Sequence, residues 1–281
     1  MLISRSFSNR LLLAIFWSAG LVILLVLTGI IGYLFLRGGS SLTLEFLSTA
    51  PKGLPLGTSG GVLPAIRGTL LLVSIAVLAA AAPGLITATY LSEYGDSSKL
   101  KFLINITIQC MAGLPSIVTG LFGYAFFVVY LGFGISLLAG GLSLGIMIFP
   151  VIVLTARDAL LAVNEQYRLA GAALGVSRWY MLHRVIIPQS APGILSGILL
   201  AMGYAAGATA PIMVTAAVIS AGMNGGLTDP VMALPYHLYI LFSQHISMEK
   251  AYGTALLLVL LLLLLNITAL LLKGRHRKGG Y

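Results

Sequence analysis

Few residues in this sequence could do chemistry, and they do not form a recognisable catalytic group. The four histidines are scattered, and only His245 and Glu249 have the spacing to share a helical face, where a solvated outer surface is a better expectation than a metal site. The single Cys110 has no partner for an internal disulfide and is expected to be a small apolar residue in a buried helix.

Two common nucleotide and metal patterns are absent from the sequence. There is no phosphate loop of the form G-x-x-x-x-G-K-[ST] and no H-E-x-x-H zinc pattern. We therefore predict no catalytic residues, no metal site, no cofactor and no enzymatic activity of the chain's own. Energy for any work must come from another protein.

The composition is that of a chain surrounded by lipid. Hydrophobic residues make up 59% of the chain, charged residues 8%, and mean hydropathy is +1.04, whereas soluble domains carry about 25% charged residues. These values predict an all-α polytopic membrane protein. The excess of 16 Lys and Arg over 7 Asp and Glu is typical of membrane topology and contact with anionic lipid. Nucleic acid is not an expected partner, because no basic patch is interleaved with stacking aromatics.

Uncharged stretches near or above the ~20 residues needed to cross hydrocarbon predict six transmembrane helices. We place them at residues 11–36, 68–92, 102–131, 142–156, 194–220 and 251–272, and none of these ranges contains Asp, Glu, His, Lys or Arg. A kink is expected at Pro83-Gly84 and an interruption at Gly113-Leu114-Pro115.

The segments between these helices are expected to be irregular. Residues 37–64 suit an outer loop, residues 132–141 a glycine-rich hairpin, and residues 222–249 a non-spanning segment with apolar pieces of about 10 residues. Glu93, Asp96, Lys99 and Lys101 form a charged turn between the second and third helices.

The basic residues test which side of the membrane each loop occupies. Six helices put both termini on one side, with four basic residues opposite, namely Arg37, Lys52, Arg67 and Lys250. The other twelve lie with the termini: Arg5, Arg10, Lys99, Lys101, Arg157, Arg168, Arg178, Arg184, Lys273, Arg275, Arg277 and Lys278. The positive-inside rule therefore places both termini in the cytoplasm.

The longest polar stretch, residues 157–188, belongs to that cytoplasmic side. Its pattern predicts a short amphipathic helix over residues 163–174, with Gly175 as a left-handed cap. Ser177 can cap a second helix that Pro188 would stop. The expected faces are Tyr167, Ala170, Gly171 and Leu174 on the first helix and Trp179, Leu182, His183 and Ile186 on the second. Such a helix pair could dock on a partner protein or lie on anionic lipid, and spacing alone favours neither.

The same stretch resembles the cytoplasmic signature of the inner-membrane permeases of binding-protein-dependent ABC importers. That signature reads Glu-Ala-Ala, three residues, Gly, nine residues, Ile-x-Leu-Pro. This chain has Leu169-Ala170-Gly171, then Gly175, then Val185-Ile186-Ile187-Pro188 at the same spacing. Within the family the chain is most similar to A-type permease subunits of phosphate uptake systems. The stretches that carry this similarity are residues 64–73, 112–123, 207–212 and 232–242.

The resemblance implies the fold, the partners and the location of the protein. The fold would be that of a type I ABC importer permease, with one transmembrane permease domain over residues 1–281, a core at about 63–272 and a coupling loop at 157–188. Its partners would be a second permease subunit in a heterodimer, a dimer of ATP-binding cassette ATPases, an external phosphate-binding protein and membrane lipid. The location would be the cytoplasmic (inner) membrane of a prokaryote.

The resemblance also implies roles for residues of the loop. The coupling residues that would contact the ATPase are Glu165, Tyr167, Arg168, Ala170, Gly171, Gly175, Arg178 and Pro188. Of these, Glu165 and Arg168 are the expected polar contacts, because Leu169 stands where the signature has its leading glutamate.

A second departure lies in the fifth helix. The family usually has Gly-Arg-Ala-x-Gly-Glu-Thr-Ala-Pro, whereas Tyr204 and Ala208 replace the arginine and the glutamate here. We interpret Tyr204 and Ala208 as a neutral substitute for an ion pair that would lie on one helix face. With no charge in the spans, an oxyanion path would depend on hydroxyls and on helix N-termini at breaks. The candidate pathway residues are Pro115, Ser116, Thr119, Tyr204 and Thr209, with helix packing as the alternative role.

These observations predict a permease subunit that moves inorganic phosphate across the membrane without catalytic activity. The alternatives are a permease for another oxyanion and a degenerate paralogue that acts in assembly or regulation.

Overall fold

The computed structural model of the chain describes residues 5–94, 99–220 and 225–278, and most of them are helical. Asp96 of the expected charged turn and residues 222–224 of the expected outer segment lie outside the described residues.

Five helices of the described chain are long and apolar enough to cross a membrane. They are α1 (Arg5–Gly38), α3 (Leu63–Thr89), α6 (Leu137–Leu161), α9 (Ile187–Gly207) and α12 (Met248–Lys278). A sixth crossing results if α4 (Lys99–Ala112) and α5 (Ser116–Gly123), which meet at a bend of 101°, count as one broken span. The expectation of an all-helical membrane protein is confirmed.

The second span is longer than expected, and Pro83 lies inside it. Helix α3 begins five residues before the expected Gly68, runs through Pro83, and continues as the π-helical turn η2 (Tyr90–Tyr94). The third span is interrupted where Gly113 and Pro115 predict it, because Pro115 lacks the N–H that would continue the ladder. A second π-helical segment, η3 (Tyr124–Tyr130), follows α5.

The fourth span starts earlier than residue 142 because two glycines belong to the helix rather than to a hairpin. Ser136 caps α6, with its hydroxyl accepting a hydrogen bond from the Ala139 N–H at 3.2 Å. A Cβ on Gly141 would lie 2.5 Å from Ile75 Cγ2, so the glycine allows α6 to pack closely on α3. At its other end the helix continues to Leu161, beyond the expected Ala156.

The fifth span differs from the expected residues 194–220 at both ends. It is preceded without a break by α8 (Arg178–Met181) and the π-helical turn η4 (Leu182–Ile186), so residues 178–207 form one 30-residue helix. Pro188 lies in the first turn of α9 and does not stop the helix. A proline normally clashes with the carbonyl four residues earlier, and the wider π-helical turn just before it displaces that carbonyl. The helix ends at Gly207, and the short α10 (Ala210–Thr215) follows.

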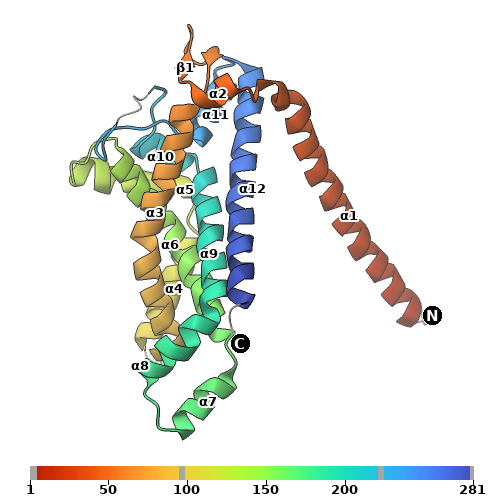
Figure 1. Ribbon diagram of the computed structural model, residues 1–281, viewed down its shortest axis with the longest axis vertical. Helices are drawn as coiled ribbons and strands as arrows, with labels where there is room; N and C mark the ends of the chain where they lie inside the picture. Colours follow the sequence, from red (N-terminus) through yellow and green to blue (C-terminus); the bar gives the residue numbers. More distant parts are fainter. Residues whose placement is uncertain (1–4, 95–98, 221–224, 279–281) are drawn as a thin grey trace.

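Helices α3, α6, α9 and α10 share the main hydrophobic core. Leu72, Ile148, Ile152, Ala201 and Ile212 are among its buried members. In Figure 1, α3, α6, α9 and α12 run side by side, whereas α1 stands away from them and leaves most of its apolar surface exposed. Near its C-terminal end α1 contacts α12, where the hydroxyls of Tyr33 and Tyr252 are 3.2 Å apart.

Short elements cover one end of the bundle, as expected for residues 37–64 and 222–249. They are η1 (Gly39–Ser41), α2 (Leu44–Ser48), the antiparallel pair β1 (Pro51–Lys52) and β2 (Ser59–Gly60), and α11 (Leu234–Ser243). Lys250 of α12 connects that helix to β2, because its Nζ donates a 2.9 Å hydrogen bond to the Gly60 carbonyl. With 10 residues, α11 is too short to span, and it packs on α12 and α3.

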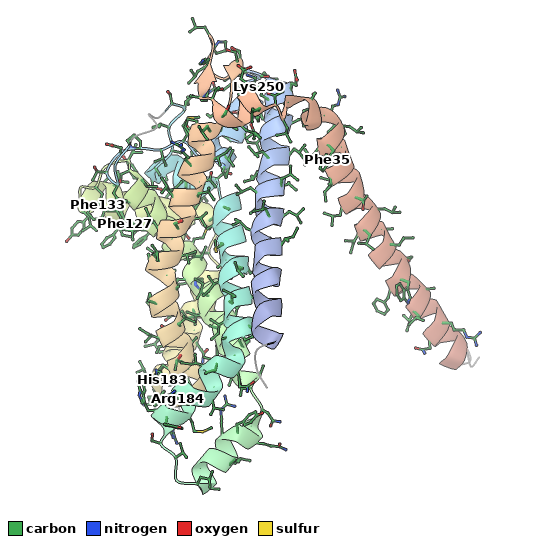
Figure 2. The ribbon with its side chains drawn as sticks, viewed as in Figure 1. Phe35, Phe127, Phe133, His183, Arg184 and Lys250 are labelled. Carbon is green, nitrogen blue, oxygen red and sulfur yellow. The ribbon has the colours of Figure 1, made fainter. Side chains whose placement is uncertain are left out.

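The opposite end carries α7 (Glu165–Ala173) and α8. The N-terminus of α1 and the C-terminal end of α12 point to this end in Figure 1. Figure 2 places His183 and Arg184 here and Lys250 at the other end. This separation agrees with the grouping of Arg184 with the termini and of Lys250 on the opposite side.

Two expectations about single residues are wrong. Cys110 is exposed, because α4 packs on α6 along one face and leaves the face with Cys110 uncovered. His245 and Glu249 do not share a helical face, since His245 lies in the turn between α11 and α12 with φ of 52°. Across the described residues, no three His, Cys, Asp or Glu side chains are grouped to hold a metal ion.

Candidate coupling and pathway sites

Helix α7 is bounded by the caps that its sequence encodes. The Asn164 side chain accepts a hydrogen bond from the Gln166 N–H at 2.9 Å, so the helix begins at Glu165 rather than Val163. Gly175 has φ of +68°, which confirms it as the left-handed cap. Two backbone hydrogen bonds close the turn, from Gly175 to Ala172 and from Val176 to Gly171. The Ser177 hydroxyl then caps α8 by accepting from the Tyr180 N–H, as expected.

Most of the apolar surface of α7 and α8 is uncovered. Only Gly171 of α7 is buried, against the side chain of Met181. Tyr167 is 48% exposed and Leu174 81% exposed, while Ala170 is exposed between them. Tyr167, Ala170 and Leu174 of the expected face are therefore exposed and can contact another molecule, whereas Gly171 is covered by Met181.

The expected face of the second helix divides into two parts. Leu182 and Ile186 are buried, whereas Trp179 is 65% exposed and its ring lies 3.8 Å from that of His183. The π-helical turn over Leu182–Ile186 changes the residue spacing within this stretch, so the four side chains do not lie on one face as an α-helical repeat would place them. Trp179 adds an aromatic ring to the exposed surface.

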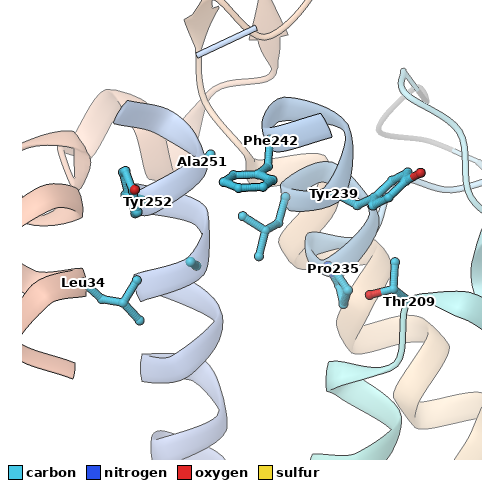
Figure 3. A pocket seen from close by; sticks show the side chains of 9 residues that line it. Leu34, Thr209, Pro235, Tyr239, Phe242, Ala251 and Tyr252 are labelled. Carbon is cyan, nitrogen blue, oxygen red and sulfur yellow. The ribbon is translucent and has the colours of Figure 1, made fainter. Parts of the chain in front are cut away.

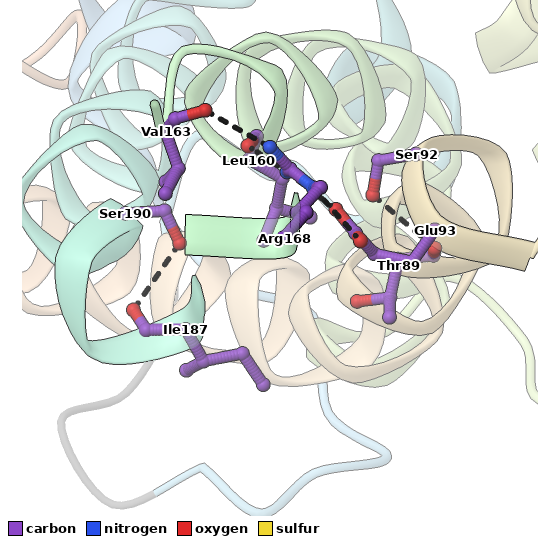
Figure 4. A network of polar contacts seen from close by, with 8 residues as sticks. All are labelled: Thr89, Ser92, Glu93, Leu160, Val163, Arg168, Ile187 and Ser190. Atoms are coloured by element: carbon purple, nitrogen blue, oxygen red, sulfur yellow. Dashed lines mark hydrogen bonds and ion pairs between the residues drawn. The ribbon is translucent and has the colours of Figure 1, made fainter. Parts of the chain in front are cut away.

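Arg168 does not point to a partner but is bound within the chain (Figure 4). Its Nη2 donates to Glu93 Oε1 at 2.7 Å and its Nε to Glu93 Oε2 at 3.2 Å. Nη1 donates to the Val163 carbonyl and Nη2 to the Leu160 carbonyl, both at 2.9 Å. The hydrogen bonds to Glu93 raise the pKa of Arg168 above its ordinary value, so the guanidinium stays charged. Four of its five N–H donors are used in this way.

A cleft of about 340 Å³ lies between α7, α8 and the end of α3. Its lining includes Glu93, Arg168, the expected contact residues Glu165 and Arg178, and Leu169. Leu169, which stands at the glutamate position of the signature, is 64% exposed. The two carboxylates and two guanidinium groups give the cleft a mixed charge.

The first candidate pathway element is the N-terminus of α5. Pro115 is its N-cap residue and makes no side-chain cap hydrogen bond. Ser116 is half-buried and Thr119 is 7% exposed. The structure therefore has a helix start at the expected break, with a hydroxyl in its first turn.

The second candidate element is the break between α9 and α10, which packs against α5. A Cβ on Gly120 would lie 2.7 Å from Pro211 Cα, so only glycine permits this distance between the two backbones. The start of α10 thereby packs on the middle of α5, although the two are about 90 residues apart in the chain.

Thr209 faces a different part of the molecule from α5. It lines a cavity of about 350 Å³ together with Pro235, Tyr239 and Phe242 of α11 and Tyr252 of α12 (Figure 3). The other lining residues are Leu34, Leu238, Ala251 and Ala255. The lining is mainly apolar, so the Thr209 hydroxyl is one of few polar groups that reach it.

Tyr204 and Ala208 do not lie on one helix face as expected. Tyr204 is 51% exposed on α9, but the helix ends at Gly207 and Ala208 has an extended conformation with ψ of 123°. The i, i+4 relation of a helix needs all five residues to be helical. The family's glutamate position thus belongs to the break, which sequence spacing did not reveal.

The arrangement of the helices is that of a permease of an ABC importer. The chain superposes on a chain of the MetNI methionine ABC transporter in an inward-facing conformation with a TM-score of 0.60. The match covers 77% of this chain and 94% of that chain at 18% sequence identity, which establishes the shared fold.

The sequence then gives the family. The family described as "Binding-protein-dependent transport system inner membrane component" matches residues 83–278, and the chain belongs to it. The chain is 32% identical to "Phosphate transport system permease protein PstA 1" of Mycobacterium tuberculosis (strain CDC 1551 / Oshkosh), over 96% of this chain and 90% of that protein. It is 34% identical to "Phosphate transport system permease protein PstA" of Pasteurella multocida (strain Pm70), over 94% of each chain. The chain is therefore a multi-pass membrane protein of a transport family.

Proposed function

We propose that the chain is the permease subunit of an ATP-driven importer that moves inorganic phosphate across the cytoplasmic membrane. The observation that carries this proposal is the similarity over nearly the whole chain to relatives named as phosphate permeases. In this proposal the permease has no catalytic activity, and a partner ATPase dimer hydrolyses ATP. A second permease subunit and an external phosphate-binding protein complete the assembly.

The exposed surface of α7 and α8 is where the ATPase would dock. Leu174, Tyr167 and Trp179 supply apolar area, and Glu165 and Arg178 supply charge at the cleft beside it. This division supports docking by shape and apolar contact, with the small Ala170 allowing close approach. Four of the five donors of Arg168 are occupied by Glu93 and by the carbonyls of Leu160 and Val163, so Glu165 is the better candidate for a polar contact.

This docking requires the α7 end of the molecule to face the cytoplasm. Twelve of the 16 basic residues belong to the side of the termini, which supports that orientation. Residues 1–281 then act as one transmembrane domain with its coupling segment within residues 157–188.

The anion would pass near the two helix breaks. The N–H groups at the start of α5 and the hydroxyls of Ser116 and Thr119 can hydrogen-bond an oxyanion without a buried cation. Thr209 could do the same at the second break, with Tyr204 beside it in the chain. A neutral pathway suits transport, because a strongly bound anion would be released slowly.

One observation favours a second candidate function. Leu169, Tyr204 and Ala208 replace three charged residues of the family pattern, as would occur in a paralogue that keeps the fold and serves assembly or regulation. The same losses would fit a permease for an oxyanion other than phosphate.

Reconstitution separates these functions. The complete complex would be placed in liposomes with ATP inside, and uptake of labelled phosphate, sulfate and molybdate would be measured with the external binding protein. We expect ATP-dependent uptake of phosphate that excess unlabelled sulfate does not reduce. Uptake of sulfate or molybdate without uptake of phosphate would show that the transported anion is not phosphate. An intact complex that hydrolyses ATP and moves none of the three would contradict the importer function.

A further inference from the structure

Helix α7 has little packing to hold it in place. Of its nine residues only Gly171 is buried, next to the side chain of Met181. A force applied to the exposed face of α7 would therefore move the helix freely unless another contact transmits it to the bundle.

Arg168 provides such a contact, because its guanidinium joins α7 to the ends of two spans. The carbonyls of Leu160 and Val163 belong to the last turn of α6 and the residues just after it, where the helix dipole favours a cation. Glu93 lies in the last turn of the span Leu63–Tyr94, where the dipole disfavours a carboxylate. Arg168 thus neutralises Glu93 and two helix C-termini together.

The pair is shielded from water more than a surface ion pair. The side chains of Arg168 and Glu93 are 26% and 12% exposed, and the carboxylate is bound through both oxygens. The neighbouring pair of Arg157 and Asp158 is different, since the Asp158 side chain is 66% exposed. Exposed pairs contribute little, whereas removing one partner from a shielded bidentate pair leaves a charge without compensation.

The two spans that Arg168 joins also reach the helix breaks. Helices α3 and α6 pack along their lengths, with Gly84 of α3 against Ile152 of α6. Ile212 of α10 and Ala216 just after it belong to the same core. Buried contacts therefore run from Arg168 through α3 and α6 to α10, and α10 packs on α5 through Gly120.

We propose that the Arg168–Glu93 pair is a positioning contact that makes α3 and α6 follow the movement of α7. The proposal rests on the function proposed above, and it assigns to Arg168 a role inside the chain instead of a contact with the ATPase. Arg168 and Glu93 act as a unit, so losing either one separates ATP hydrolysis from transport while the ATPase stays docked.

The test compares Glu93→Gln, Arg168→Gln and the double variant in the full reconstituted complex. Three quantities are measured: ATPase subunit recovered per permease, ATP hydrolysis rate, and phosphate transported per ATP. We expect recovery of the ATPase within two-fold of the unmodified complex and at least a ten-fold drop in phosphate per ATP for each single variant. The double variant should fall no further than the singles, because both remove the same contact.

The matched control is Asp158→Asn, which neutralises the exposed carboxylate at the same end of α6. It should change the phosphate transported per ATP by less than two-fold. A purely structural role would lower protein yield and both activities in proportion, leaving phosphate per ATP unchanged, and would overturn the proposal. Loss of ATPase recovery in Arg168→Gln but not in Glu93→Gln would also overturn the proposal, because it would show that Arg168 contacts the ATPase. If the unmodified complex moves no phosphate, the proposed function fails instead, and the two failures are thereby distinguished.

Discussion

At the α7 end a short helix has one buried residue and one arginine bound to the ends of two spans, whereas in the α5–α10 region two short helices pack backbone against backbone. The first arrangement leaves Leu174 81% exposed and concentrates its polar contacts on Arg168. In the second, Gly120 and Pro211 approach too closely for any side chain between them. A surface that docks a partner can be open, but a passage that must discriminate between ions needs fixed geometry.

The largest loss of phosphate uptake should come from adding a side chain where α5 and α10 are in contact. In Gly120→Ala the new Cβ would lie 2.7 Å from Pro211 Cα and 3.2 Å from the Ala210 carbonyl oxygen, so backbone must move. Overpacking of this kind costs about 1–3 kcal/mol. We expect phosphate uptake in liposomes to fall at least ten-fold, with ATPase recovery unchanged.

The control for that substitution is Gly203→Ala in α9, where a Cβ would meet no atom within 4 Å. Alanine in place of glycine inside a helix should stabilise it by up to about 1 kcal/mol. Uptake by Gly203→Ala at or above the unmodified level is expected. Equal losses of uptake in the two variants would show that transport does not depend on the close contact between α5 and α10.

A smaller effect is expected at Gly175, because α7 and α8 can adjust in open space. Gly175 has φ of +68° and no neighbour within 4 Å, so Gly175→Val would be strained by its backbone alone. The left-handed conformation costs a residue with a Cβ about 1–2 kcal/mol. ATPase binding, measured by titration of the purified permease pair, should weaken about 5- to 30-fold.

Asparagine is the matched control at this position, since it adopts left-handed conformations more readily than valine does. We expect Gly175→Asn to bind the ATPase within about three-fold of the unmodified protein. If valine and asparagine weaken binding equally, the loss comes from the added side chain and not from the backbone.

The sequence predicted the α7 end well because its signals are local. Gly175 and Ser177 were predicted as caps because they act on backbone groups a few residues away, whereas the Asn164 cap was not predicted and α7 starts two residues later than expected. Pro188 was wrongly expected to stop the second helix. Glu93 was missed as the partner of Arg168, since the two are 75 residues apart and no local pattern links them. The place of Glu93 in the charged turn after the second span was the one available signal.

The α5–α10 region was harder to predict because its contacts are between distant segments. Gly113 and Pro115 predicted the break before α5, but the span expected over residues 194–220 did not include the end of α9 at Gly207 or the start of α10 at Ala210. Gly140 and Gly141 suggested a hairpin, yet they lie inside α6 because that helix packs closely on α3 and α10. A single sequence does not distinguish a glycine that allows two helices to pack closely from a glycine that forms a turn.

The central claim is that the exposed face of α7 is where the ATPase docks, and Leu174 tests it most directly. Leu174→Glu and Leu174→Lys place either charge on a side chain that is 81% exposed, so neither should disturb folding. Burying a leucine contributes about 1.5–3 kcal/mol to an interface. Leu44→Glu is the control, because Leu44 is 82% exposed at the opposite end.

The measurement is the dissociation constant of the ATPase for the reconstituted permease pair. Our account predicts a rise of at least ten-fold for both Leu174 variants and less than two-fold for Leu44→Glu. Unchanged affinity in both Leu174 variants, with tighter adsorption of Leu174→Lys to anionic lipid, would contradict it and would mean that α7 lies on the membrane surface.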